Sequence, residues 1–274
     1  MSPTRMPVFF VSHGGGPWPW VDGMKQMFVK TAREFAALPS RLPAKPKAVL
    51  MITGHWEAAR FSVSTSERPA MDYDYSGFPE HTYRLQYPAP GLPALASRVR
   101  ELLDQAGFES ADDASRGFDH GTFVPMSLMY PDAGVPVVLL SLRSDYSAAE
   151  HIRVGQAISS LRDEGVLIMG SGLTYHNMRG FGRNESTPVA EAFEAYLNDA
   201  ISQADVVTRN DMLIHWEKAP GARLAHPQED HLLPLMVIAG AAGDDVGHRV
   251  FVDHVMNVAM ASYQFGASRS PASI

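Results

Sequence analysis

The sequence predicts an α/β fold, with one domain in which a mostly parallel or mixed sheet is flanked by helices. Short, continuous apolar runs typical of buried strands recur along the chain, and segments with helical spacing separate them. Strands that alternate with helices favour a layered sheet, and sites in such folds gather beyond the carboxyl ends of the strands. The 274 residues include 45% hydrophobic and 19% charged residues and no evident linker, so we expect one domain over residues 1–274. Residues 267–274 are expected to form a frayed tail.

The first half of the chain predicts three strands and two helices. Residues 8–11 form an apolar run that ends in a glycine-rich turn. Residues 22–38 place apolar side chains on one helical face, and Pro39 is expected to end that helix. Residues 48–52 form a second buried strand, followed by a turn at Thr53 and Gly54. The remaining elements are an alternating strand at 61–65, a long loop over 71–93 rich in Tyr, Pro and Gly, and a helix over 93–105.

The second half repeats the alternation. Residues 117–122 open an apolar stretch that continues to Met129, and residues 137–142 form a third strong strand. A helix over 148–162 precedes the strand at 165–169, which leads into the glycine-rich segment 170–172. The last predicted elements are helices over 188–204 and 231–240 and a strand candidate at 250–254.

Composition excludes several classes of function. The net charge of -7 and scattered Lys and Arg residues leave no basic surface for nucleic acid. No apolar stretch approaches the roughly 20 residues that cross a bilayer, and the amino-terminal apolar run is too short for a signal sequence. We therefore expect a soluble, cytoplasmic protein that does not bind membranes. Because the chain has no cysteine, any metal must be held mainly by His, Asp or Glu.

Four histidines stand beside glycines at strand ends or helix starts: His13, His55, His120 and His176. Side chains at the carboxyl ends of neighbouring parallel strands converge on one cleft, and imidazole both binds metals and transfers protons near neutral pH. The glycines indicate tight turns or close approach of the backbone to a ligand. A fifth histidine, His231, begins an apolar helix, where a buried imidazole needs a partner. The pattern predicts a shared site, with metal binding the favoured interpretation.

These segments resemble a known family. They are similar to motifs of the class III extradiol ring-cleavage dioxygenases. The segments that carry the similarity are Ser12-His13-Gly14-Gly15-Gly16, Gly54-His55-Trp56, Gly77-Phe78-Pro79, Tyr87-Pro88-Ala89-Pro90-Gly91, Gly117-Phe118-Asp119-His120-Gly121, Gly170-Ser171-Gly172 with His176-Asn177, and Asp230-His231-Leu232-Leu233-Pro234-Leu235. The resemblance is to the LigB-like branch that includes DOPA 4,5-dioxygenase, and it covers nearly the whole chain in order. It implies an enzyme that uses O2 to open a substituted catechol to a muconic semialdehyde at a mononuclear metal.

The resemblance also implies roles for the histidines. His13, His55 and His231 would hold the metal, which is Fe(II) in the active dioxygenases and sometimes Zn(II) in isolated proteins. His176 would be the acid/base that takes a proton from the catechol, and His120 would hydrogen-bond a substrate oxygen or dioxygen. The wider family completes its site with a glutamate, so Glu229 is an alternative third ligand to His231.

Further residues are candidates for supporting roles. Asp119 and His226 could orient an imidazole beside the metal, as could Glu229. Tyr73 and Phe78 are candidates for the substrate wall. Two other functions stay open: a zinc-dependent hydrolase that uses the same pocket, and a non-catalytic metal-binding protein of the kind the Memo proteins represent. The sequence leaves the physiological catechol, the choice of Fe or Zn and the formation of a homo-oligomer undecided.

Overall fold

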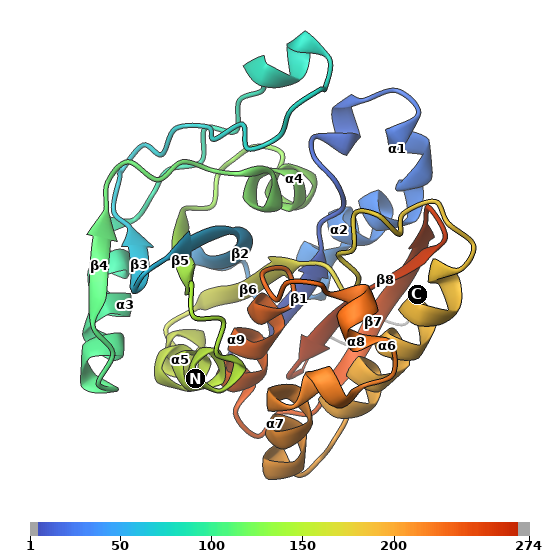
Figure 1. The fold of residues 1–274 in the computed structure, drawn as a ribbon. Helices are drawn as coiled ribbons and strands as arrows, with labels where there is room; N and C mark the ends of the chain where they lie inside the picture. The colour runs from blue at the N-terminus through green and yellow to red at the C-terminus, as the bar shows by residue number, and fades with distance from the viewer. Residues whose placement is uncertain (1–4, 268–274) are drawn as a thin grey trace, which may run out of the picture.

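One mixed sheet with helices on both faces organises the molecule, which a computed structural model describes over residues 5–267 (Figure 1). The sheet has eight strands in the order β4-β3-β5-β2-β6-β1-β8-β7. Their bounds are β1 Val8–Ser12, β2 Ala48–Ala58, β3 Phe61–Ser64, β4 Ser110–Asp113, β5 Val137–Arg143, β6 Val166–Gly172, β7 Gly247–Val255 and β8 Val258–Phe265. The expected α/β fold is therefore confirmed.

The centre of the sheet is parallel, and antiparallel pairs join it to the strands on either side, while the edge strand β4 pairs in parallel with β3. Strands β5, β2, β6 and β1 pair in parallel, so their carboxyl ends lie at one edge. β8 pairs antiparallel with β1 and β7, and β3 pairs antiparallel with β5. The candidate histidines that follow β1 and β6, together with His55 near the end of β2, therefore lie along the same edge.

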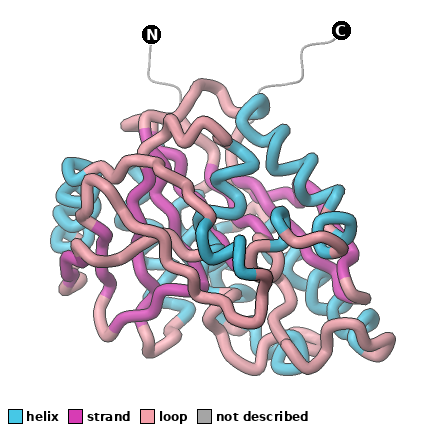
Figure 2. The backbone as a smooth tube through the Cα atoms, turned by 90° about the horizontal axis from the view of Figure 1, so that it is seen from above, coloured by secondary structure: helices cyan, strands magenta, loops and turns pink. Residues whose placement is uncertain are grey.

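The helices form two layers. Their bounds are α1 Met24–Met27, α2 Val29–Arg41, α3 Pro93–Gln105, α4 His120–Met129, α5 Ala148–Ile158, α6 Ser186–Ile201, α7 Val206–Ile214, α8 Ala222–Ala225 and α9 Leu233–Ala242. Helices α5 and α9 pack together, and α9 covers β6, β1 and β2. Helices α2 and α4 pack together on the opposite face (Figure 1). Figure 2 shows from above how helices surround the strands. No helix among the described residues is long and apolar enough to cross a membrane.

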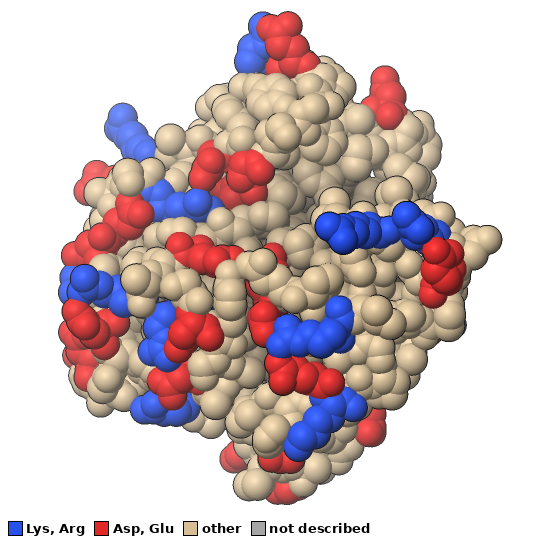
Figure 3. Space-filling model, in the orientation of Figure 1, with Lys and Arg blue, Asp and Glu red and all other residues tan. Residues whose placement is uncertain are grey.

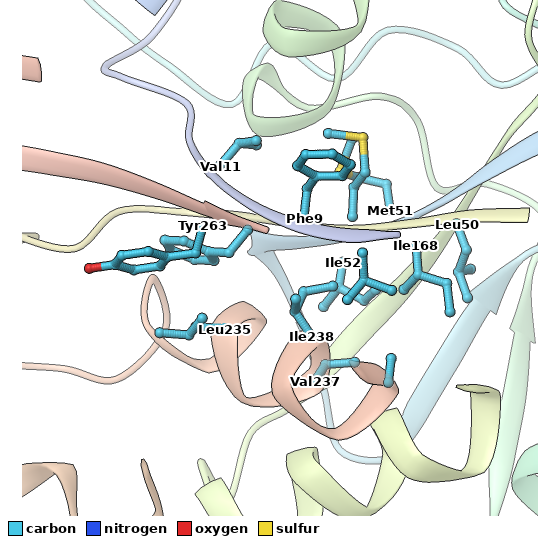
Figure 4. Close-up of a cluster of buried hydrophobic side chains, with 14 of the residues drawn as sticks. Phe9, Val11, Leu50, Met51, Ile52, Ile168, Leu235, Val237, Ile238 and Tyr263 are labelled. Carbon is cyan, nitrogen blue, oxygen red and sulfur yellow. The ribbon is translucent and has the colours of Figure 1, made fainter. Parts of the chain in front are cut away.

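Apolar side chains fill the space on both faces of the parallel strands. In Figure 4, Phe9, Val11 and Met51 project to one side of the sheet, and Ile52 and Ile168 project to the side of α9. This is the two-residue alternation expected of a strand, and both faces are buried because helices cover both. Helix α9 is itself buried over its whole length, which explains why its sequence is apolar on every side.

Several local predictions were wrong. Thr53 and Gly54 do not form a turn, because β2 continues to Ala58 past a register shift in its pairing with β5. The glycine-rich segment 170–172 likewise belongs to β6. Pro39 does not end α2 but lies inside its last turn, and the helix continues to Arg41.

The carboxyl-terminal hairpin was only partly predicted. The candidate strand at 250–254 is the centre of β7, but β8 was not predicted. The two strands are joined through Met256 and Asn257, both with positive φ, in place of the glycine that usually marks such a turn. In the predicted tail, Ala267 is exposed and outside any helix or strand, and residues 268–274 lie outside the described part of the chain.

Candidate metal centre and its cavity

Five imidazoles gather at the carboxyl edge of the parallel strands. His13 follows β1, His55 lies in β2 within the stretch where its register with β5 shifts, and His120 begins α4. His176 follows β6, and His231 lies in the turn before α9. Neighbouring rings in this group have centroids 3.4 to 5.4 Å apart. The structure thus brings together every histidine that the sequence placed in the site.

Three of these rings bring their Nε2 atoms to one point. The Nε2 of His55 lies 3.1 Å from that of His13 and 3.1 Å from that of His231. Two nitrogens bound to one zinc or iron ion at about 2.1 Å would be separated by roughly 3.0 to 3.4 Å. The separations found here therefore suit a shared cation.

The surroundings of His13 determine which of its nitrogens carries the proton. The hydroxyl of Ser171 donates to the carbonyl of Gly121, so its oxygen can only accept from the ring. The Nδ1–H of His13, 3.0 Å away, donates to that oxygen. The lone pair of His13 is therefore on Nε2, the atom that faces His55.

A single carboxylate, Asp74, serves two histidines from the long loop. It accepts from Nδ1 of His120 at 2.9 Å, and its other oxygen lies 3.1 Å from Nδ1 of His55. Although burial alone raises the pKa of Asp74, the hydrogen bond and charge of His120 outweigh it and lower the pKa to about 2. The ionised carboxylate favours a proton on Nδ1 of both rings and leaves Nε2 of His55 free.

Asp230 plays the same part on the opposite side of the site. It accepts a short hydrogen bond from Nδ1 of His231, and Nδ1 of His176 lies 3.4 Å from the same oxygen. Burial opposes ionisation of Asp230, but its bonds to His176 and His231 hold its pKa well below the usual range. His176 stacks on His231 with ring centroids 3.4 Å apart and keeps 22% of its side chain exposed.

The three converging rings strongly resist protonation. Burial lowers the pKa of His13 well below its ordinary value, with further lowering by the neighbouring imidazoles. Burial also lowers the pKa values of His55 and His231 to about 3. Three neutral rings whose lone pairs meet would repel one another, and a divalent cation removes that repulsion. The donor set therefore fits a metal such as Zn(II) or Fe(II).

The described residues contain two adjoining groups that could hold a cation: His13, His55 and His120, and His176, Asp230 and His231. The contacts between Nε2 atoms cross from one group to the other through His55 and His231. Asp230 already accepts hydrogen bonds through one oxygen, as an orienting carboxylate does. This favours His13, His55 and His231 as one ligand set, with His120 and His176 beside it.

A cavity of about 450 Å³ opens directly from this centre. Its polar end is formed by His55, His120, His176 and His231. The remaining lining is formed by Gly14, Gly15, Gly16, Met24, Phe28, Tyr75, Phe78, Leu173, Met178, Phe181, Val255, Met256 and Met260. Figure 3 shows a hollow between α1 and the loop that carries the short 3-10 helix η2 Glu80–Arg84, with Lys or Arg atoms on the surface below it. The volume is typical of a small-molecule site.

Asp119 and Glu229, two residues predicted to support the metal ligands, make different contacts. Asp119 caps α4 through the amide of Thr122 and accepts from the hydroxyl of Thr53, so it joins the end of β2 to the start of α4. Glu229 pairs with Arg223 at 2.7 Å and belongs to neither cation-holding group. The structure thus places Glu229 away from the metal centre.

His226 and Tyr73 do not line the cavity. Neither ring nitrogen of His226 has a hydrogen-bond partner within the described residues, and the ring lies between Phe193 and Trp216. The hydroxyl of Tyr73 donates to the carbonyl of Leu85, and Tyr73 is not part of the cavity wall. Phe78 does line the cavity, as the sequence predicted.

The sequence did not identify the residues that orient the imidazoles: Ser171, Asp74 and Asp230. Asp230 directly precedes His231, but an acidic residue before a helix is normally interpreted as a cap. Asp74 is one of two aspartates in a loop far from the histidines in sequence. Only the fold shows that both carboxylates face imidazoles.

The glycines of β2 and β6 have a structural reason that is not turn formation. A Cβ on Gly172 would lie 2.1 Å from the carbonyl oxygen of His231, and a Cβ on Gly54 would lie 3.2 Å from the Cα of His231. The amide of Leu173 donates to the same carbonyl of His231 at 3.0 Å. These glycines therefore let the backbone of His231 approach two strands, which brings its ring to those of His13 and His55.

Comparisons with known proteins agree with this geometry. The family model described as the catalytic LigB subunit of aromatic ring-opening dioxygenase matches residues 7–266. The chain is 40% identical to the 4,5-DOPA dioxygenase extradiol of Beta vulgaris over 86% of this chain and 87% of the relative. It is 35% identical to the protein of the same name from Escherichia coli K12, over 88% and 87% of the two chains, and 35% identical to Dioxygenase tasH of Hapsidospora irregularis, over 97% and 88%.

A solved structure has the same fold. It is the uncharacterized protein JW3007 from Escherichia coli K12, with a TM-score of 0.77 and 30% sequence identity. The match covers 96% of this chain and 100% of that one.

Proposed function

The chain belongs to the family of the catalytic LigB subunit of aromatic ring-opening dioxygenases and is an extradiol dioxygenase, and we propose that it opens a substituted catechol with O2 at a mononuclear Fe(II) centre. The observation that carries the proposal is the convergence of three neutral imidazoles beside a largely apolar cavity, two of them in its wall. The product would be a muconic semialdehyde.

In this proposal His13, His55 and His231 hold the metal through Nε2. Ser171, Asp74 and Asp230 keep the Nδ1 protons in place, so that each ring presents a lone pair to the cation. When bound, Fe(II) would allow both catechol oxygens and O2 to share one coordination sphere. Three protein ligands leave positions for these molecules.

The two remaining imidazoles would handle the substrate's protons. His176 lines the cavity, and its Nδ1 faces Asp230, so its Nε2 is left to accept a proton from a catechol hydroxyl. The charge of Asp230 would stabilise the imidazolium that forms. His120, fixed by Asp74 and also in the cavity wall, would hydrogen-bond a substrate oxygen. The apolar lining would exclude water from the ring during cleavage.

A second function follows from the donor set itself. Three histidines also form zinc sites, in which a metal-bound hydroxide attacks an ester or related group. The same cavity would then serve a zinc-dependent hydrolase, with His176 as the base. The named relatives favour ring opening over this alternative, and they do not support a non-catalytic, Memo-like role.

The test is to load the protein with Fe(II) without oxygen and then add a catechol and air. We expect a yellow ring-opened product, a loss of roughly 10²- to 10⁴-fold in kcat in His176→Ala, and unchanged metal content in that variant. The matched control is His215→Ala, because His215 lies on the surface and pairs with Asp211. No turnover of any catechol, with esterase activity in the zinc-loaded protein, would contradict the proposal.

A further inference from the structure

The cavity has an unusual composition for an enzyme whose relatives are named for DOPA, a catechol with a charged amino-acid side chain. Among the residues that the structure describes, none of those lining the cavity is Lys, Arg, Asp or Glu. Beyond the imidazoles, the only other polar side chain in the wall is that of Tyr75, and its hydroxyl already donates to the carbonyl of Thr82 at 2.6 Å. A charged substituent would therefore find no Lys, Arg, Asp or Glu side chain to pair with among the described residues that line the cavity.

The wall opposite the imidazoles consists mainly of methionine and phenylalanine. Phe28, Val255 and Met260 are buried, and Met178 and Met256 lie at the mouth with 72% and 46% of their surface exposed. Methionine is flexible and polarizable, so such a wall adapts to apolar groups of different shapes. These two exposed methionines continue the apolar wall of the cavity to its mouth, where a substituent of the ligand can pack against them.

The mouth is a fixed part of the fold. The amide of Gly182 donates to the carbonyl of Met256 at 2.7 Å, which ties the segment after β6 to the turn of the β7–β8 hairpin. The side chain of Asn257 donates to the carbonyl of Gly182 at 3.2 Å. Met178 and Met256 are therefore held on one rim, and the apolar wall does not depend on a disordered lid.

The volume of the cavity favours a catechol that carries a substituent on its ring. An apolar cavity of about 150 Å³ is enough to bind benzene. The cavity here has about 450 Å³, so a catechol at the imidazole end leaves room for a substituent of several carbon atoms. That substituent would lie against the methionines and phenylalanines.

We propose that the substrate is a catechol with an uncharged, apolar substituent, and that Met24, Phe28, Met178, Phe181 and Met260 form the wall that selects it. The inference rests on the proposed ring-opening function and narrows its substrate class. Two basic side chains directly follow wall residues in sequence, Lys25 after Met24 and Arg179 after Met178; both are exposed, and neither lines the cavity. An anionic substituent could reach Arg179 only by leaving the apolar wall.

Three catechols of equal length test this directly: 4-propylcatechol, 3-(3,4-dihydroxyphenyl)propionate and dopamine, which end in a methyl, a carboxylate and an ammonium group. We expect kcat/KM of the Fe(II)-loaded protein for 4-propylcatechol to exceed that for either charged analogue by at least about 100-fold, because an unpaired charge is costly to desolvate. In the series from catechol to 4-propylcatechol, kcat/KM should rise about three- to fourfold with each carbon. L-DOPA should behave as the charged analogues do.

Two variants test which side chains at the cavity mouth determine the choice between charged and uncharged substituents. Met178→Lys, at an exposed position, should raise kcat/KM for the propionate at least about fivefold and leave dopamine a poor substrate. Arg179→Met should leave kcat/KM for the propionate and for dopamine unchanged relative to 4-propylcatechol. If Arg179→Met instead lowers turnover of the propionate alone at least fivefold, a rim cation binds the substituent and the inference is wrong.

The outcomes separate this inference from the function on which it rests. If L-DOPA, dopamine or the propionate is opened as efficiently as 4-propylcatechol, the apolar substrate class is overturned and the ring-opening function stands. If no catechol is opened, including unsubstituted catechol, the proposed function itself fails.

Discussion

Replacing Asp230 by Asn removes the charge that orients two imidazoles while keeping the size of the side chain. Asp230 accepts from Nδ1 of His231 and lies 3.4 Å from Nδ1 of His176. An amide can turn its NH2 group toward Nδ1, which would move the proton of His231 to Nε2 and remove the lone pair that a metal needs. Changes of this kind beside a metal ligand commonly weaken metal binding about 10- to 100-fold, or about 1.4 to 2.7 kcal/mol.

The assay is a competitive titration of Fe(II) or Zn(II) against a chelator, followed by kcat at saturating Fe(II). We expect the weaker metal affinity and, because His176 loses its anionic partner as well, a fall in kcat of roughly 10²- to 10⁴-fold that excess metal does not restore. The matched control is Glu229→Gln, since Glu229 is the adjacent carboxylate and pairs with Arg223. Wild-type metal affinity in Asp230→Asn, or loss of metal in Glu229→Gln, would refute the assignment of Asp230 as the orienting group and restore Glu229 as a ligand candidate.

Three further predictions follow from the same geometry. His231→Ala should lose the metal, whereas His120→Ala should retain it and lose activity; equal metal loss in both, measured by elemental analysis, would place His120 among the ligands. Gly172→Ala should lower the free energy of unfolding by about 1 to 3 kcal/mol or more and release the metal, because the new Cβ would lie 2.1 Å from the carbonyl oxygen of His231. The control is Gly15→Ala, whose Cβ would have no atom within 4 Å, so thermal unfolding of this variant should be nearly unchanged. Burial lowers the pKa of His226 to about 3, whereas the pKa of a histidine in the unfolded chain is near 6.5. Between these two pH values the unfolded chain binds a proton that the folded chain does not, so the free energy of unfolding decreases as the pH falls. The metal-free variant His226→Phe should therefore gain about 2 kcal/mol relative to wild type between pH 7 and pH 5 in urea unfolding, and an unchanged difference between the two pH values would contradict a buried, neutral His226.

Much of the fold follows from local sequence patterns. The four strands of the parallel centre and most of the long helices were predicted because burial on both faces requires continuous apolar runs and because helices repeat their apolar face regularly. The β8 strand was missed because its turn at Met256 and Asn257 lacks the glycine that marks most two-residue hairpins. The continuation of β2 through His55 was missed because Thr53 and Gly54 have the composition of a turn, although in the fold Gly54 makes room for the backbone of His231.

The sequence by itself determined which residue types could do the chemistry and at which edge of the sheet they would gather. Parallel strands end at the same edge, so histidines that follow them must be neighbours, and the absence of cysteine left imidazoles and carboxylates as ligands. Only the tertiary structure shows which groups orient the five imidazoles. The nitrogen that carries the proton in each ring is determined by Ser171, Asp74 and Asp230, which come from three different parts of the chain, and the proposed roles of the imidazoles depend on it. That none of the described residues in the cavity wall is Lys, Arg, Asp or Glu is likewise a property of the assembled fold, since α1, the long loop, the segment after β6 and the β7–β8 hairpin each contribute a part of the wall.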